Sequence, residues 1–227
     1  MKKRTFSSLF ALLLVLFIVL VPNSSKDSTS VAYAENNLLS GIRIDREYII
    51  PDSIDFCTYY VILATNNTGS DIRVSADFTA LDAEGNVLRK VNDYSDAVKK
   101  GQQFILYGQF NNKVAVMAAD YIFEFTVSET DRCAYTAVAI DTKDMDNAIE
   151  VSATNMMGRD IQCVDVRTVF IKNGRAVAFD KVNIADAGTT FHGGSTNSQM
   201  IGMFAGDYDN FIMTYTTAAD TNAGEDI

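Results

Sequence analysis

The sequence predicts an all-β protein made of two tandem antiparallel β-sandwiches. Three observations support this: a segment recurs 89 residues later, apolar and polar residues alternate over short runs, and glycine-containing turns separate the runs. The segment Ala64–Ile72 reappears as Ala153–Ile161, and the spacing holds to Gly85 and Gly174. Solenoid and propeller repeats recur every 20 to 50 residues or so, so the longer period indicates two copies of a whole domain.

Residues 1–34 have the pattern of a signal peptide. Lys2 to Arg4 supply the positive charge, Leu9–Val21 is unbroken and apolar, and Ala32-Tyr33-Ala34 offers the small residues that signal peptidase needs. The alternative is an uncleaved membrane anchor, because Phe6–Val21 approaches the lower limit of about 17 residues for a membrane span. We therefore expect an extracellular protein, either secreted or associated with the cell surface.

Without these residues the chain carries a formal net charge of about −13. Nucleic-acid binding relies on a basic surface, and anionic membranes attract basic segments, so the charge argues against both. The expected partner is an unknown protein or glycan at the cell surface. Membrane contact is expected only through an uncleaved anchor.

The strands are expected in two domains, residues 35–130 and 131–220, followed by a polar tail at 221–227. The period-two alternation gives matching opening and closing strands in the two copies. These strands are Gly41–Ile50, Cys57–Thr65 and Tyr121–Val127 in the first copy, and Ala134–Ile140, Ala148–Thr154 and Asn210–Tyr215 in the second. A single helical turn is expected at Asp93–Lys99.

One long strand in each copy shows which side chains face the core. The inward positions are Val74, Ala76, Phe78 and Ala80 in the first copy, and Val164, Val166, Thr168 and Phe170 in the second. At the 89-residue spacing these two sets differ by one position, which would turn the second set toward water. A bulge or a one-residue change in the preceding turn is therefore predicted, with Asp165 and Arg167 facing outward.

The turns recur as well. Asp82–Asn86 corresponds to Ile171–Arg175, where Asn173-Gly174 is a strong hairpin signal because both residues tolerate positive φ. Gly101–Phe104 is matched to Gly188–Phe191, so the second copy is expected to be two residues shorter at this point.

The stretch Asp71–Leu88, followed by Val98–Phe104, resembles the FxLYD-type bacterial surface modules. Such modules have an Asn-rich turn, a long strand, a D-x-x-G hairpin and a later L-x-x-G motif. The second copy resembles them less closely, because Asn173-Gly174 replaces the aspartate turn. The resemblance implies two immunoglobulin-like sandwiches on a secreted or surface protein, and it supplies no catalytic residues.

Two groups of residues are candidates for ligand binding. Tyr59, Tyr60, Tyr107 and Tyr121 are residues that stack on a ligand when exposed, although tyrosines on alternating strands more often cover a core. Calcium takes six to eight oxygen ligands, and Asp141, Asp144 and Asp146 with Glu150, or Asp207 with Asp209, are its candidate ligands. Their spacing does not follow the EF-hand pattern, so a solvated acidic loop is the alternative. No cofactor is expected.

The sequence gives little support for a catalytic site or for disulfide bonds. His192 is the only histidine, and Gly193-Gly194-Ser195-Thr196-Asn197 lacks the second glycine of a hydrolase nucleophile elbow. Cys57, Cys133 and Cys163 are interpreted as buried thiols, although a bridge between Cys57 and Cys133 stays open.

The sequence therefore predicts a non-enzymatic extracellular structural or binding module. A carbohydrate-binding or calcium-assisted adhesion module is the alternative, and a hydrolase is a distant third.

Overall fold

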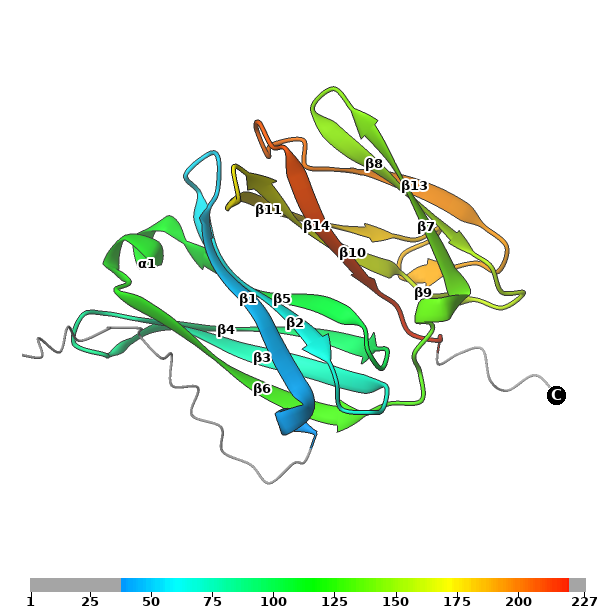
Figure 1. The fold of residues 1–227 in the computed structure, drawn as a ribbon, viewed down its shortest axis with the longest axis horizontal. Helices are drawn as coiled ribbons and strands as arrows, with labels where there is room; N and C mark the ends of the chain where they lie inside the picture. Colours follow the sequence, from blue (N-terminus) through cyan, green and yellow to red (C-terminus); the bar gives the residue numbers. More distant parts are fainter. Residues whose placement is uncertain (1–37, 221–227) are drawn as a thin grey trace, which may run out of the picture.

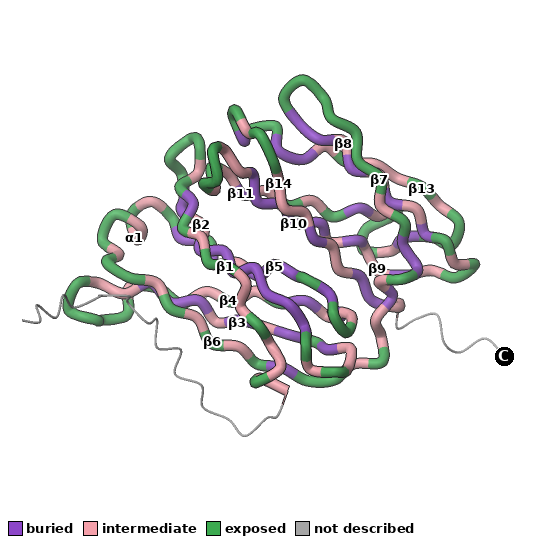
Figure 2. Tube along the Cα trace, viewed as in Figure 1, coloured by how far each residue is buried: buried purple, intermediate pink, exposed green. Residues whose placement is uncertain are grey.

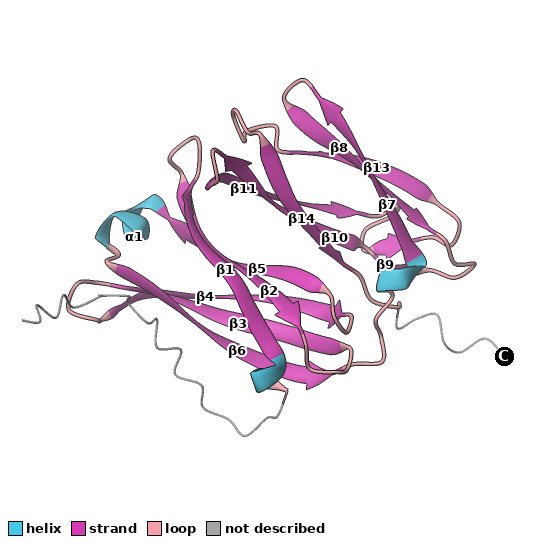
Figure 3. Cartoon of the chain, viewed as in Figure 1, coloured by secondary structure: helices cyan, strands magenta, loops and turns pink. Residues whose placement is uncertain are grey.

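The computed structural model describes residues 38–220, which form an all-β structure of stacked sheets (Figure 1). The predicted signal peptide and the tail at 221–227 lie outside the described residues. Helix is confined to three short segments, as Figure 3 shows. Within the described part of the chain, none of these helices is long and apolar enough to cross a membrane.

The first sandwich contains six strands in two antiparallel sheets. Its strands are β1 (Ile42–Pro51), β2 (Cys57–Asn66), β3 (Ile72–Leu81), β4 (Val87–Val98), β5 (Gln103–Asn111) and β6 (Asp120–Glu129). One sheet has the order β1-β2-β5 and the other the order β4-β3-β6. The 3-10 turn η1 (Leu39–Gly41) precedes β1, and helix α1 (Asn112–Met117) joins β5 to β6.

The second sandwich repeats this plan with more interruptions. Its elements are η2 (Tyr135–Ala137), β7 (Val138–Met145), β8 (Ala148–Asn155), β9 (Ile161–Gln162), β10 (Val164–Lys172), β11 (Arg175–Ile184), β12 (Thr190–Phe191), β13 (Thr196–Ile201) and β14 (Asn210–Thr216). The two main sheets have the orders β13-β8-β7 and β11-β10-β14, and β12 pairs with β9. The predicted boundary at 130/131 falls between β6 and η2.

The strand order is immunoglobulin-like in both copies. The first, second and fifth strands share a sheet, and the third and sixth are neighbours in the opposite sheet, as in immunoglobulin domains. Each sandwich encloses its own apolar core. Phe78, Phe104 and Phe110 are fully buried in the first core, and Phe170 and Phe191 are fully buried in the second. Figure 2 shows the buried stretches running along the strands, with the connecting loops exposed.

A buried asparagine fixes the same turn in each copy. Asn66 and Asn155 are 0% exposed, and the side-chain amide of each donates to the carbonyl four residues further on at 2.9 Å. The Asn66 amide also donates to the Val98 carbonyl at 3.1 Å, and Asn155 makes the equivalent bond to Phe191 at 3.1 Å. A buried amide without partners is costly, so these bonds hold the turn against the following strand.

The predicted one-residue adjustment is confirmed and lies at Cys163. The second copy breaks its long strand there into β9 and β10, and the Cys163 amide donates to the Thr189 carbonyl. Beyond this break Val164, Val166 and Phe170 face the core, as expected. The Asn173-Gly174 hairpin is also confirmed, with φ of 50° and 75°.

The match of Gly101 to Gly188 is wrong. The Gly101 amide donates to the Asn66 carbonyl, and the equivalent bond to Asn155 comes from Gly194. Gly188 instead lies in a turn between β11 and β12, where the first copy has the uninterrupted strand β4. The second copy is therefore longer here, not shorter.

Two further expectations about local structure are corrected. Asp93–Lys99 is not a helical turn, since β4 runs through Val98 and pairs with β3 along its length. Ala134–Ile140 is a strand only from Val138, because Tyr135–Ala137 form η2. Helix α1 was not expected; the Asn111 side chain caps it by accepting a hydrogen bond from the Val114 amide at 3.0 Å.

Candidate functional site: the contact between the two sandwiches

The sheet β1-β2-β5 of the first sandwich lies against the sheet β11-β10-β14 of the second. Contacts join β1 to β11 and β5 to β14, so four sheets are stacked (Figure 1). Strand β2 is buried on both faces, with Ile62 and Ala64 in the first core and Val61 and Leu63 in the layer between the sandwiches. An unbroken apolar run such as Val61–Ala64 is typical of a strand buried on both faces.

A third apolar cluster fills this layer. Its buried members are Ile50, Val61, Leu63, Ile105, Val169 and Phe179. The Phe179 ring lies 4.8 Å from the Tyr107 ring and 5.2 Å from the Tyr59 ring, measured between centroids. Each fully buried side chain of this type stabilises the contact by about 1.5–3 kcal/mol. Domains normally move relative to one another unless their contact is large and apolar, so we expect these two to move together.

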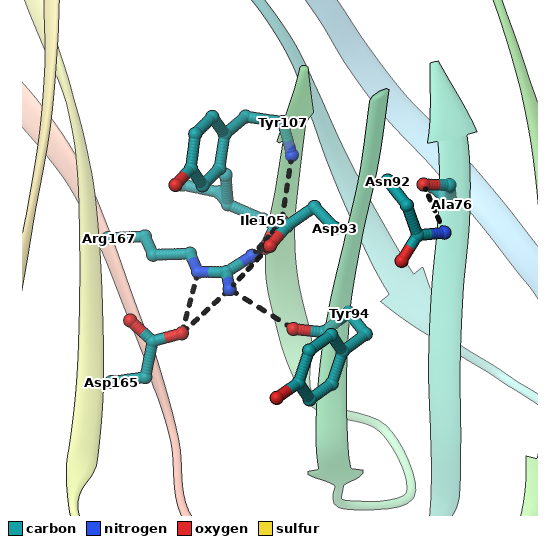
Figure 4. A network of polar contacts seen from close by, with 8 residues as sticks. All are labelled: Ala76, Asn92, Asp93, Tyr94, Ile105, Tyr107, Asp165 and Arg167. Atoms are coloured by element: carbon teal, nitrogen blue, oxygen red, sulfur yellow. Dashed lines mark hydrogen bonds and ion pairs between the residues drawn. The ribbon is translucent and has the colours of Figure 1, made fainter. Parts of the chain in front are cut away.

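Arg167 on β10 crosses this layer and is only 5% exposed (Figure 4). Its Nη1 donates to Asp93 Oδ2 at 2.5 Å and to the Ile105 carbonyl at 2.7 Å. Nη2 donates to Asp93 Oδ1 at 3.1 Å and to the Tyr94 carbonyl at 3.2 Å. Nε donates to Asp165 Oδ2 at 2.9 Å. Every guanidinium nitrogen therefore has an acceptor, and most of these acceptors belong to the other sandwich.

The charges at this contact compensate one another. Burial works against the Arg167 charge, but Asp165 and Asp93 outweigh it and raise the pKa of the guanidinium. Burial also raises the pKa of the Asp93 carboxyl, which Arg167 and the Tyr107 amide oppose. Asp93 accepts three hydrogen bonds, two from Arg167 and one from the Tyr107 amide at 3.1 Å. Such bonds favour the ionised carboxylate, so the pair is an ion pair.

Arg167 was expected to face outward, and it does leave the core of its own sandwich. The outer face of β10 is covered by the first sandwich, so an outward side chain there is buried rather than solvated. Asp93 lies on the edge strand β4, within the segment for which the sequence predicts a helical turn. No feature of the sequence indicates an ion pair between Arg167 and Asp93, because their contact depends on how the two sandwiches stack.

A polar cleft of about 220 Å³ lies beside Arg167 between the two sandwiches. Its lining includes Ser95 and Asp96 of β4, and Cys163, Asp165 and Lys181 of the second sandwich. Ser95 Oγ and Asp165 Oδ1 are buried and have no hydrogen-bond partner among the described residues. A polar cavity of this size is large enough to hold ordered water.

The four candidate tyrosines are divided between two layers. Tyr59 and Tyr107 pack against the cluster between the sandwiches. Tyr60 is 3% exposed and belongs to the first core, where its ring lies 5.7 Å from that of Tyr121. The Tyr60 hydroxyl donates to Glu47 at 2.6 Å, and burial raises the pKa of this phenol. The tyrosines do not share one exposed surface, which favours the core interpretation.

The candidate calcium ligands are divided between several elements. Asp144 at the end of β7 and Asp146 in the following turn border a hollow of about 490 Å³ together with Asp207 and Asp209, so the structure brings two members of the first set beside the second set. Glu150 lies instead on β8. Asp141 is exposed on β7 and caps the Thr142 amide at 2.9 Å. Within residues 38–220, no three acidic, histidine or cysteine side chains are close enough together to hold a metal ion.

The remaining candidates have structural partners. His192 Nδ1 lies 3.1 Å from Asp160 Oδ2, and the Ser195 backbone carbonyl accepts the Asn155 amide. In the described range, no hydrogen bond joins the His192 ring to the Ser195 hydroxyl, so the geometry does not form a catalytic pair. Cys57, Cys133 and Cys163 are free thiols, and the open Cys57–Cys133 bridge is not formed.

Comparison with known proteins gives no family. No protein-family model and no curated protein matches the chain. One similar solved structure is red sea bream transglutaminase, at 8% identity and a TM-score of 0.24 over 79% of this chain and 28% of that one. Another is a β-glucuronidase from glycoside hydrolase family 2, at 10% identity and a TM-score of 0.18 over 88% of this chain and 25% of that one. The chain spans about a quarter of these enzymes, and at such scores the similarity carries no functional argument.

Proposed function

We propose that this protein is a non-enzymatic extracellular structural or binding module, secreted or held at a bacterial cell surface. The observation that supports it most is the filled contact between the sandwiches. Enzymes commonly place their active site in a cleft between domains. Here apolar side chains and Arg167, whose guanidinium nitrogens all have acceptors, occupy most of that position and leave a polar cleft of about 220 Å³ beside Arg167, so the stack serves better as a stiff support for its outer surfaces.

This proposal is tested by incubating fluorescently labelled residues 35–227 with isolated bacterial cell walls and, separately, with immobilised secreted proteins. We expect saturable retention on one of these, competed by unlabelled protein. Heat-unfolded protein is the control. Absence of saturable retention on both would contradict the binding role.

The alternative is calcium-assisted or carbohydrate-binding adhesion. The hollow bordered by Asp144, Asp146, Asp207 and Asp209 gathers the carboxylates that hard cations prefer, although no three of these side chains lie close enough together in residues 38–220 to hold an ion. The divided tyrosines give the carbohydrate version no comparable support. Calorimetry with Ca²⁺ separates the two functions: the module proposed here gives no heat and no rise in Tm. A heat signal that Asp144→Asn and Asp207→Asn abolish would favour the alternative.

A further inference from the structure

Within residues 38–220, each copy has one strand fewer than a complete immunoglobulin-like sandwich. Seven strands are usual, and the last of them lies beside the sixth. In the first copy the chain instead leaves β6 at Glu129 and enters the second sandwich through residues 130–134. Within the described residues, β6 therefore pairs only with β3, and its other side is a sheet edge. The turn η1 contacts β6 without adding a strand to it.

The free edge of β6 has regular backbone geometry. Its register with β3 runs without a shift from Ile72↔Glu129 to Leu81↔Asp120. Long, regular edges are usually blunted by proline, a bulge or charged side chains, lysine above all. Strand β6 contains no proline, lysine or bulge, and its charged side chains are all carboxylates. Strand β1, the edge of the facing sheet, has a bulge between Ile44 and Arg46 and ends at Pro51. On the opposite side of the sandwich β4 contacts β5, which leaves no such opening.

The direction of the free backbone groups follows from one hydrogen bond. The Tyr121 amide donates to the Asp120 carboxylate at 3.0 Å, so it points away from β3 toward the free side. In an antiparallel strand every second residue directs its N–H and C=O to the same side. Phe123 and Phe125 therefore also present donors and acceptors at the edge, whereas Glu124 and Thr126 bond to β3.

The side chains along this edge are incompletely covered. Tyr121, Phe123 and Phe125 face the core but are only half-buried. On the outer face of the same sheet, Ile122 is 44% exposed and Glu124 is exposed. An added strand would cover the three aromatic side chains with its inward side chains, and would place its outward side chains beside Glu124.

The acidic side chains of β6 disfavour a second copy of this strand at the edge and favour a basic one. Pairing of two β6 strands across a two-fold axis at their centre would bring the two Glu124 carboxylates together, and like charges on neighbouring strands are destabilising. The chain as a whole is also acidic. A strand with lysine or arginine at its outward positions is complementary instead.

From the open edge, the half-buried aromatic side chains and the charge, we propose that β6 is the acceptor site for an extended peptide strand of a partner protein. That strand carries apolar side chains on one face and basic side chains on the other. Main-chain hydrogen bonds supply the affinity, and the alternate side chains supply the specificity. The inference rests on the binding role proposed above and names the chemistry of the partner.

The test uses residues 35–227 and a synthetic, end-blocked octapeptide of alternating valine and lysine. Amide hydrogen exchange followed by NMR is expected to show Phe123 and Phe125 exchanging rapidly in the free protein. Saturating peptide should slow them by about tenfold or more, with Glu124 and Thr126 protected throughout. A peptide of four valines followed by four lysines has the same composition without the alternation, and it should give no protection.

A charge-reversing variant locates the site. Glu124→Lys is expected to weaken binding of the alternating peptide by about fivefold, because it replaces an opposite-charge neighbour with a like one. The matched control is Glu84→Lys, which makes the same charge change at an exposed side chain in the turn between β3 and β4 and should leave binding unchanged. Equal weakening by both variants would indicate non-specific attraction and overturn the proposal.

Other outcomes also decide the matter. Protection at amides outside β6, or no binding of the alternating peptide at millimolar concentration, would overturn the strand-acceptor site. Concentration-dependent protection of Phe123 and Phe125 without peptide would show a second copy as the occupant and would likewise contradict it. If cell-wall or secreted-protein retention persists while the peptide fails, the proposed function stands and only this inference falls.

Discussion

Asp77 and Arg167 occupy equivalent positions on the long central strand of the two copies, yet their surroundings are opposite. Asp77 lies on the outer sheet of the first sandwich and pairs with Lys90 at 2.9 Å, where both side chains are 39% exposed or more. Arg167 faces the other sandwich and its side chain is 6% exposed. The inward positions of this strand are thus apolar or small in both copies, whereas the outward positions have different surroundings.

This difference in burial predicts that the Asp77–Lys90 and Arg167–Asp93 ion pairs contribute very different amounts to the free energy of unfolding. Exposed pairs contribute about 0–1 kcal/mol because water screens the attraction. A buried pair is costly to break, because removing one partner leaves a buried charge without compensation. The largest effect should therefore be found at Arg167.

Arg167→Gln is expected to lower the free energy of unfolding by about 3–5 kcal/mol, because Asp93 and Asp165 lose their counter-charge. Urea denaturation followed by circular dichroism measures this. A loss below about 1 kcal/mol, the value expected of a surface pair, would remove the distinction between the two sites.

Phe179→Ala is expected to cost about 3 kcal/mol and to loosen the contact between the sandwiches. Phe179 is 8% exposed and touches both Tyr59 and Tyr107. Calorimetry should show one unfolding transition in the original chain and two separated transitions in the variant. A single transition in both would mean that the aromatic cluster does not couple the copies. Val177→Ala, on the same strand but 36% exposed, is the control.

Asn66→Ala and Asn155→Ala should each cost about 1–3 kcal/mol, since each leaves buried carbonyls unpaired. The two losses should agree within about 1 kcal/mol because the bonds to the turn and to the following strand are equivalent. The Asn66 loss should be the larger, since its side chain also donates to the Lys99 carbonyl and accepts from the Thr68 hydroxyl. Separate urea titrations of the two variants provide the comparison. Clearly unequal losses would show that the buried asparagine does not stabilise the turn to the same extent in the two copies.

Asp77→Asn should cost less than about 1 kcal/mol at pH 7. The hydrogen bond from Lys90 lowers the pKa of the Asp77 carboxyl in the folded protein. A lowered folded pKa gives stability that is present above the unfolded pKa of about 3.9 and is lost as the pH falls further. The variant and the original should therefore converge in stability below pH 4. A difference that grows on acidification would contradict this sign.

Much of the fold was predictable because the alternation of apolar and polar residues indicates directly which side chains of a strand face the core. The alternation around Val164 required an extra residue, and Cys163 supplies it. The predicted helical turn at Asp93–Lys99 is wrong for a physical reason: β4 is an edge strand, and its polar side chains face the second sandwich instead of solvent.

The contact between the sandwiches was less predictable. One signal was present, since the run Val61–Ala64 lacks alternation and so indicates burial on both faces. The Arg167–Asp93 pair had no signal, because its partners are 74 residues apart on strands of different domains. The match of Gly101 to Gly188 shows a similar limit, since glycine marks a turn but not which turn.

The central claim is that a third apolar cluster and Arg167 join the two copies into one stiff body. Residual dipolar couplings of backbone amides, measured in one weakly aligning medium, test it directly. A single alignment tensor is expected to fit the strands of residues 42–129 and of residues 138–216 together. Two tensors of different magnitude or orientation would show the sandwiches moving independently and would contradict it.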